Sequence, residues 1–137
     1  MPIRAVFDTN VWISGLMWRG DPYRCLSLAR AGLVQLAYCP PMAAELAEKL
    51  RTKFRYSEHE IRAVVYELRR IASRVEITGQ VKAVVADPDD DKFIECALVA
   101  GADLIVSADR HLLDLVQYQH IQIHSASDFL VRVDRAV

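Results

Sequence analysis

The chain has 137 residues, of which 53% are hydrophobic, and a formal net charge of −1. This length suits one domain, expected to cover residues 1–137, and the apolar content excludes a disordered chain. No apolar run is long enough to cross a bilayer. The three cysteines, Cys25, Cys39 and Cys96, are widely separated, which disfavours a disulfide framework or a zinc site. These features together predict a cytoplasmic protein with reduced thiols and no membrane association.

The first half of the chain alternates apolar strands with helices. A mostly apolar strand over residues 3–7 ends at Asp8, and a second strand is expected over residues 34–39. Helices are predicted over residues 11–16, from Asp21-Pro22 to Gly32, over residues 41–51 and over residues 57–72. The last of these opens with a capping box, Ser57 followed by Glu60. In the helix over residues 41–51, Glu45 borders the apolar stripe and does not face open water.

The second half continues the alternation. A short strand is expected over residues 75–78, then a helix from about Asp90 to Ala100 with Asp89 as its N-cap and Gly101 as its stop. A strand over residues 103–107, a short helix over 112–116, an edge strand over 121–124 and a closing helix over 125–133 follow. Such alternation predicts a three-layer α/β/α domain with a mostly parallel central sheet of four to five strands.

An acidic run precedes the fifth of these helices. Four acids stand within five positions, Asp87-Pro88-Asp89-Asp90-Asp91, and Glu95 lies one helical turn after Asp91. Carboxylates at helix starts are often caps in a solvated turn, so the run alone does not establish a site.

Three further acids change this interpretation. Asp8 and Asp109 each follow a predicted strand, and Glu45 lies early in a helix that follows a strand. The carboxyl ends of parallel strands and the starts of the following helices share one edge of the sheet. We therefore expect Asp8, Glu45, Asp91 and Asp109 to converge there, with Asp87 or Asp90 as alternatives to Asp91.

Four converging carboxylates indicate a cation site. Mg²⁺ or Mn²⁺ accepts such oxygen ligands, and one or two of these ions support hydrolysis of a phosphodiester bond without a protein nucleophile. Outside the acids discussed above, basic residues outnumber acidic ones, which suits a phosphate-rich substrate such as RNA. A phosphoacceptor signalling module is a less favoured alternative, because it needs an additional acid before Asp8, where Val6 and Phe7 stand.

These motifs, taken in order, resemble the PIN domain family. The resemblance is carried by Asp8-Thr9-Asn10, by Glu45, by Asp91-x-x-Ile94-x-x-Ala97 and by Val106-Ser107-Ala108-Asp109. It implies a Mg²⁺- or Mn²⁺-dependent nuclease, mostly acting on RNA, with Asp8, Glu45, Asp91 and Asp109 as the metal-binding catalytic acids. By the same resemblance Asn10 would support Asp8 and Ser107 would hydrogen-bond within the site. Glu95 would add a ligand or a water contact.

The chain is most similar to the small PIN toxins of toxin–antitoxin pairs. The resemblance implies an antitoxin partner and a homodimer, and we interpret the apolar segment around Trp18 as the surface for one of them. A PIN nuclease of RNA maturation or decay remains an alternative. Many such toxins have Asn at the position of Asp109 and a further acid beyond it, whereas His111 and Leu112 stand there. Asp109 must then supply the fourth charge.

Three basic side chains near the expected edge complete the sequence predictions. Lys92 and Arg110 are expected to contact the substrate. We interpret His111 as structural or solvated, with a phosphate contact as the alternative.

Overall fold

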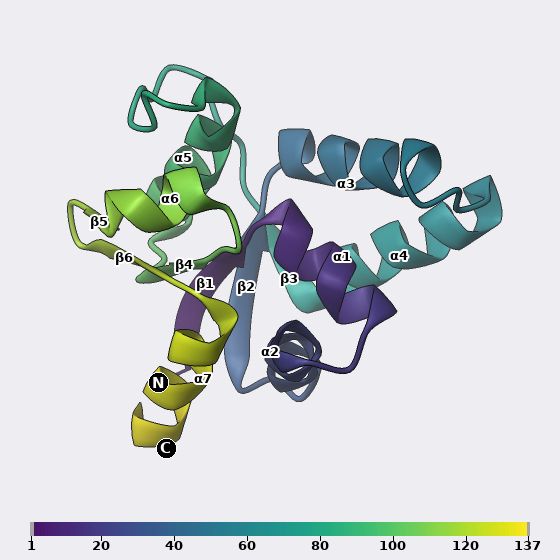
Figure 1. The fold of residues 1–137 in the computed structure, drawn as a ribbon, viewed down its shortest axis with the longest axis horizontal. Helices are drawn as coiled ribbons and strands as arrows, with labels where there is room; N and C mark the ends of the chain where they lie inside the picture. Colours follow the sequence, from purple (N-terminus) through teal and green to yellow (C-terminus); the bar gives the residue numbers. More distant parts are fainter. Residues whose placement is uncertain (1, 137) are drawn as a thin grey trace.

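A six-stranded sheet forms the centre of the molecule, seen in a computed structural model that describes residues 2–136 (Figure 1). Its order is β3 (Ala72–Arg74), β2 (Val34–Tyr38), β1 (Ile3–Phe7), β4 (Leu104–Val106), β6 (Ile121–His124) and β5 (Gln117–Tyr118). Neighbouring strands are parallel except for the last pair, β5 and β6. This confirms the mostly parallel α/β sheet. It has more strands than the predicted four to five because β3 and β5 are short edge strands.

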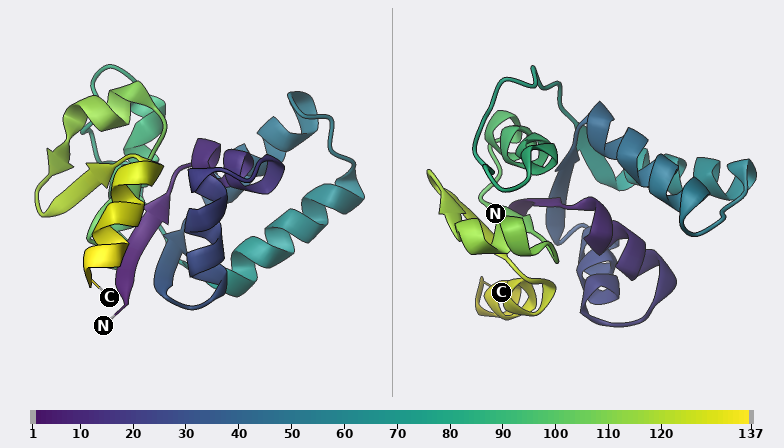
Figure 2. Two further views of the ribbon diagram at one scale, coloured as in Figure 1. Left: turned by 60° about the horizontal axis from the view of Figure 1, so that its bottom comes forward. Right: turned by 45° about the horizontal axis from the view of Figure 1, so that its top comes forward.

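Helices cover both faces of this sheet. Their bounds are α1 (Thr9–Met17), α2 (Asp21–Arg30), α3 (Pro40–Thr52), α4 (Glu58–Ile71), α5 (Asp91–Ala100), α6 (Arg110–Leu115) and α7 (Ala126–Ala136). Helices α2 and α7 pack together on one face, and α5 covers β1, β2 and β4 on the other (Figure 2). Helices α3 and α4 form a hairpin that extends past the β3 edge (Figure 1). In the described part of the chain, none of the helices has the length and apolar character needed to cross a membrane.

The central strands are apolar on both faces because both faces are covered. Val6 and Phe7 of β1 and Ile105 of β4 have no exposed surface. Phe7 meets Phe129 of α7 edge to face, with ring centroids 5.7 Å apart, which ties the closing helix to the sheet. The predicted capping box is present, since the Ser57 side chain accepts from the Glu60 N–H and the Glu60 carboxylate accepts from the Ser57 N–H.

The structure corrects two of the predicted strands. Residues 75–78 form no strand; β3 instead follows α4 directly, at Ala72–Arg74, and pairs with β2. Strand β6 is not an edge strand, because the β5–β6 hairpin places β5 outside it. Both corrections concern which strands pair across the sheet. The hydrophobic periodicity of a short apolar run does not indicate its pairing partners.

Two helix starts also differ from the prediction. Gly20 is the N-cap of α2, and Asp21 is its first helical residue. A single 3₁₀ turn, η1 (Pro88–Asp90), precedes α5, so Asp87 caps that turn and Asp89 does not cap the helix. The predicted stop of α5 is confirmed: Gly101 takes the left-handed conformation, with φ +66°.

Candidate metal centre

Asp8 stands where β1 ends and α1 begins, beside the carboxyl end of β4. Its Oδ1 accepts a 2.8 Å hydrogen bond from the Val11 N–H, so the carboxylate caps α1. Its Oδ2 accepts from the Ser107 hydroxyl and, at 3.3 Å, from the Ala108 N–H. The side chain is 2% exposed, and burial raises the pKa of Asp8 although these hydrogen bonds oppose the rise. Asp8 is therefore a buried carboxylate in a fixed orientation.

Ser107 connects Asp8 to Asp109. The Ser107 hydroxyl donates to Asp8 and accepts a 2.8 Å hydrogen bond from the Asp109 N–H. Asp109 is the N-cap of α6, where its Oδ1 accepts from the His111 N–H at 2.7 Å. One buried hydroxyl thus links the Asp8 carboxylate to the backbone of Asp109, at the ends of two strands that already pair with each other.

Glu45 reaches the same edge from the second turn of α3. It forms ion pairs with Lys92 and, at 3.3 Å, with Lys49. Burial alone would raise the pKa of Glu45, but the hydrogen bond and charge of Lys92, with smaller contributions from Thr9 and Lys49, hold that pKa below its usual value. Glu45 is therefore ionised and neutralised by two ammonium groups, unlike the other acids here.

Asp90 is the acid of the 87–91 run that faces Asp8, Glu45 and Asp109. The four carboxylates line one narrow pocket together with Asn10. Asp90 is 7% exposed, and its buried Oδ2 has no hydrogen-bond partner among the described residues. Burial, with the negative charges of Asp109 and Asp87, raises the pKa of Asp90 to about 7. Buried polar atoms normally have a hydrogen-bond partner. A buried carboxylate oxygen that lacks such a partner and lies near other negative charges therefore calls for an explanation.

The structure does not bring Asp91 and Glu95 into this pocket. The Asp91 Oδ1 accepts from the N–H groups of Ala83 and Val84, at 2.9 and 2.7 Å. The Glu95 carboxylate accepts from the Thr78 N–H and hydroxyl and from the Gly79 N–H. Both acids instead line a separate pocket, together with residues of the 77–82 segment. Helix α5 starts at Asp91, with Asp90 as its N-cap, so the two side chains point in different directions and only Asp90 lines the pocket.

The remaining predicted site residues have different surroundings. Asn10 lines the pocket but has no recorded hydrogen bond to Asp8; its Oδ1 accepts a long, 3.5 Å hydrogen bond from Lys49. Lys92 bonds Glu45 and the Asp89 carbonyl. Arg110, the first residue of α6, is exposed at the same edge. Sequence reasoning missed Lys49, although its position four residues after Glu45 on one helix indicates an ion pair.

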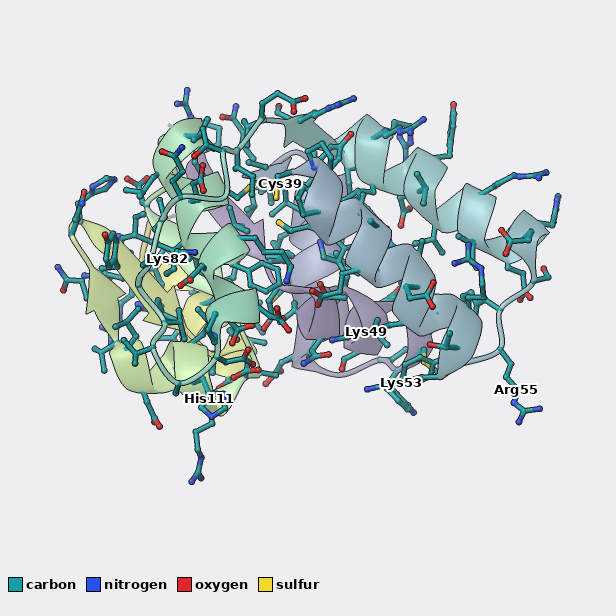
Figure 3. All side chains as sticks on the ribbon, turned by 90° about the horizontal axis from the view of Figure 1, so that it is seen from above. Cys39, Lys49, Lys53, Arg55, Lys82 and His111 are labelled. Carbon is teal, nitrogen blue, oxygen red and sulfur yellow. The ribbon has the colours of Figure 1, made fainter. Side chains whose placement is uncertain are left out.

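The pocket suits a hard divalent cation. Figure 3 looks down on the strand ends, with Lys49 on the α3 side and His111 on the far side, and carboxylate oxygens lie in the region between them. The carboxylates offer oxygen ligands, and one buried oxygen of Asp90 has no hydrogen-bond partner in the part of the chain that the structure describes. Asp87, Asp90, Asp109 and His111 each place one donor atom within 4.8 Å of the others. A cation would remove the repulsion that raises the Asp90 pKa, so the residues fit Mg²⁺ or Mn²⁺.

Comparison with known proteins agrees with this geometry. No curated protein matches the chain. The family model of the PIN domain matches residues 4–111, which include Asp8, Glu45, Asp90 and Asp109 and end within α6. The match spans most of the chain and every strand that contributes an acid to the pocket. The chain therefore belongs to the PIN domain family, whose members are metal-dependent nucleases.

Proposed function

We propose that this protein is a Mg²⁺- or Mn²⁺-dependent ribonuclease whose metal-binding acids are Asp8, Glu45, Asp90 and Asp109. The observation that carries the proposal is the buried Asp90 Oδ2, which has no hydrogen-bond partner within residues 2–136 and belongs to a residue that lines one pocket with the other three carboxylates. Asp90 takes the role that the resemblance gave to Asp91, because the Asp91 carboxylate is occupied by backbone N–H groups.

Each residue would contribute a distinct part of the chemistry. A bound divalent ion supplies Lewis-acid stabilisation of the charge that develops on the phosphate. The Asp8 carboxylate is oriented by the Ser107 hydroxyl and the Asp109 carboxylate by the His111 N–H, so their oxygens would need little reorganisation before the substrate binds. Lys92 and Lys49 balance the Glu45 charge and leave basic groups at the pocket edge, where they can contact a phosphate.

Cleavage of RNA tests the enzymatic part of this proposal. The wild type is incubated with a mixed RNA and with a DNA of the same sequence, in Mg²⁺, in Mn²⁺ and in EDTA. We expect metal-dependent cleavage of the RNA that Asp8→Asn and Asp109→Asn both abolish, because each substitution removes a charged oxygen ligand. Equal cleavage by the variants would refute the site, and equal cleavage of the DNA would refute the ribonuclease assignment.

We also propose that the protein is the toxin of a toxin–antitoxin pair in the cytoplasm, with an antitoxin partner and a homodimeric state. Support comes from the resemblance of residues 87–93 and 100–107 to such toxins. Trp18, 59% exposed at the end of α1, offers an apolar contact for a partner protein. Induced expression should arrest growth, Asp8→Asn should not, and co-expression of a small adjacent gene for a DNA-binding protein should restore growth. Wild-type expression without any growth defect would favour a housekeeping RNA nuclease.

A further inference from the structure

His111 lies directly beside the carboxylates of the pocket. It is the second residue of α6, and its Nδ1 is 3.7 Å from Asp87 Oδ2 and 3.7 Å from Asp109 Oδ1. Both distances are too long for a hydrogen bond, so the recorded contacts leave the ring nitrogen uncommitted to either carboxylate. Asp87 is similarly free on this side, because its other oxygen, Oδ1, is the one that accepts from the Asp89 N–H.

The spacing of these groups matches that of ligands around one ion. Donor atoms of Asp87, Asp90, Asp109 and His111 lie within 4.8 Å of one another. Ligands at about 2.1 Å from a first-row ion stand roughly 3 Å apart when adjacent and about 4.2 Å apart when opposite. A small contraction of the group would therefore bring all four donors into one coordination sphere, with waters in the remaining positions.

A second observation points to a ligand at this place. Asp90 is more than nine-tenths buried, contributes one oxygen to the group and keeps its Oδ2 without a hydrogen-bond partner among the residues described. A carboxylate that only closed the turn before α5 would be expected to find a backbone N–H, as Asp87 and Asp91 do.

We propose that Asp87, Asp90, Asp109 and His111 bind a divalent transition-metal ion, with His111 as a nitrogen ligand, and that this ligand makes the chain select Mn²⁺ over Mg²⁺. This site rests on the proposed function, because Asp90 and Asp109 belong both to it and to the four-carboxylate set. Asp87 and His111 lie outside the four-carboxylate set and are the new element.

The chemistry of the donors supports this selectivity. Mg²⁺ prefers oxygen ligands and retains its waters, whereas Mn²⁺, a transition-metal ion that loses its waters more readily, accepts an imidazole nitrogen beside its carboxylate ligands. Replacing one oxygen or water by the His111 nitrogen would therefore add more to the affinity for Mn²⁺ than to that for Mg²⁺. The same three carboxylates without His111 would offer no such preference.

Pulsed electron paramagnetic resonance of the bound Mn²⁺ tests the nitrogen ligand directly. The full chain is loaded with one equivalent of Mn²⁺, and modulation from ¹⁴N is recorded for the wild type, His111→Gln and His59→Gln. We expect ¹⁴N modulation in the wild type and in His59→Gln, since His59 is exposed at the start of α4, and none in His111→Gln. Absence of ¹⁴N modulation in the wild type, or failure of Mn²⁺ to bind, would overturn the proposal.

Calorimetric titration of the two ions gives an independent measure. His111→Gln keeps an oxygen of similar reach, so it should weaken Mn²⁺ about tenfold and change Mg²⁺ binding by less than about twofold. Asp87→Asn should weaken both ions. Equal weakening of both ions by His111→Gln would overturn the selectivity, even if RNA cleavage were metal-dependent. Nitrogen-coordinated Mn²⁺ in a protein that cuts no RNA would instead refute only the proposed function.

Discussion

Two neighbouring carboxylates at the start of α5, those of Asp90 and Asp91, point to opposite sides and have opposite surroundings. On one side, Asp90 lines a pocket with Asp8, Asp109 and Glu45, and one of its oxygens has no hydrogen-bond partner among the described residues. On the other side, Asp91 accepts two backbone N–H groups of the 83–84 segment. One residue of separation thus divides a strained, repulsive environment from a satisfied one.

Glu95, one helical turn after Asp91, is also a carboxylate whose oxygens accept hydrogen bonds. Burial works against its charge, but hydrogen bonds from Thr78, Gly79 and Val81 hold the pKa of Glu95 below its usual value. Together Asp91 and Glu95 fasten the 78–84 loop to α5. The difference teaches that the number of acids in a run does not define a metal site; the partners available to each oxygen do.

Neutralising Asp90 and Asp91 one at a time should give the largest difference in RNA cleavage. Asp90→Asn removes a proposed ligand, so RNA cleavage should fall roughly 100- to 1000-fold. Asp91→Asn retains an amide oxygen that can still accept the Ala83 and Val84 N–H groups, so cleavage should fall less than about tenfold. Single-turnover rates in saturating Mn²⁺, with folding checked by circular dichroism, provide the measurement. The reverse order of the two variants would make Asp91 the ligand and break the comparison.

Deleting the satisfied carboxylate should instead reduce stability. Asp91→Ala leaves the N–H groups of Ala83 and Val84 without an acceptor, which should lower the free energy of unfolding by about 2–4 kcal/mol. Urea unfolding in EDTA measures the loss, and amide hydrogen exchange should accelerate at residues 78–84 before the sheet opens. Unchanged stability and exchange would show that Asp91 does not hold this loop.

Most of the fold could be predicted from the sequence because its signals are local. The apolar runs of β1 and β2, the capping box of α4 and the stop at Gly101 each depend on nearby residues. Strand β6 was predicted at its observed bounds, but β3 was placed a few residues too late and β5 was not predicted, since a strand of two or three residues is defined by its pairing partner.

The site was predicted only as far as the sheet edge. Asp8, Glu45 and Asp109 follow strands, so topology alone brings them to one edge. Successive helical side chains differ in direction by about 100°, so only one of Asp90 and Asp91 can face the pocket. The choice between them depends on the loop that packs beside α5, because its Ala83 and Val84 N–H groups bind Asp91, and no local signal in the sequence reports that contact.

The Ser107 hydroxyl adds to the backbone N–H groups that order the repulsive side, and removing it should have an intermediate effect. Ser107→Ala deletes the donor to Asp8 Oδ2 and the acceptor of the Asp109 N–H. We expect cleavage to fall about 10- to 100-fold, with weaker Mn²⁺ binding. Ser107→Thr keeps the hydroxyl and should restore most of the activity. Full activity in Ser107→Ala would mean that backbone geometry alone orients Asp8.

The smallest predicted effect concerns the stability of the metal-free protein, which should depend on pH through Asp90. The pKa of Asp90 is raised to about 7 in the folded state, whereas an unfolded Asp titrates near 3.9. Ionised Asp90 therefore destabilises the fold above about pH 7, and this penalty is relieved as the pH falls toward the unfolded pKa.

Between pH 8 and pH 5.5 the Asp90 contribution should raise the free energy of unfolding in EDTA by about 2 kcal/mol. Asp90→Asn cannot ionise, so its stability should exceed that of the wild type at pH 8, and the difference should shrink as the pH falls. Urea unfolding at several pH values compares the two proteins. The lowered pKa values of Glu45 and Glu95 act only below about pH 4.5, outside this window. Parallel profiles for wild type and variant would mean that Asp90 finds a partner in solution, and the two sides of α5 would then not differ.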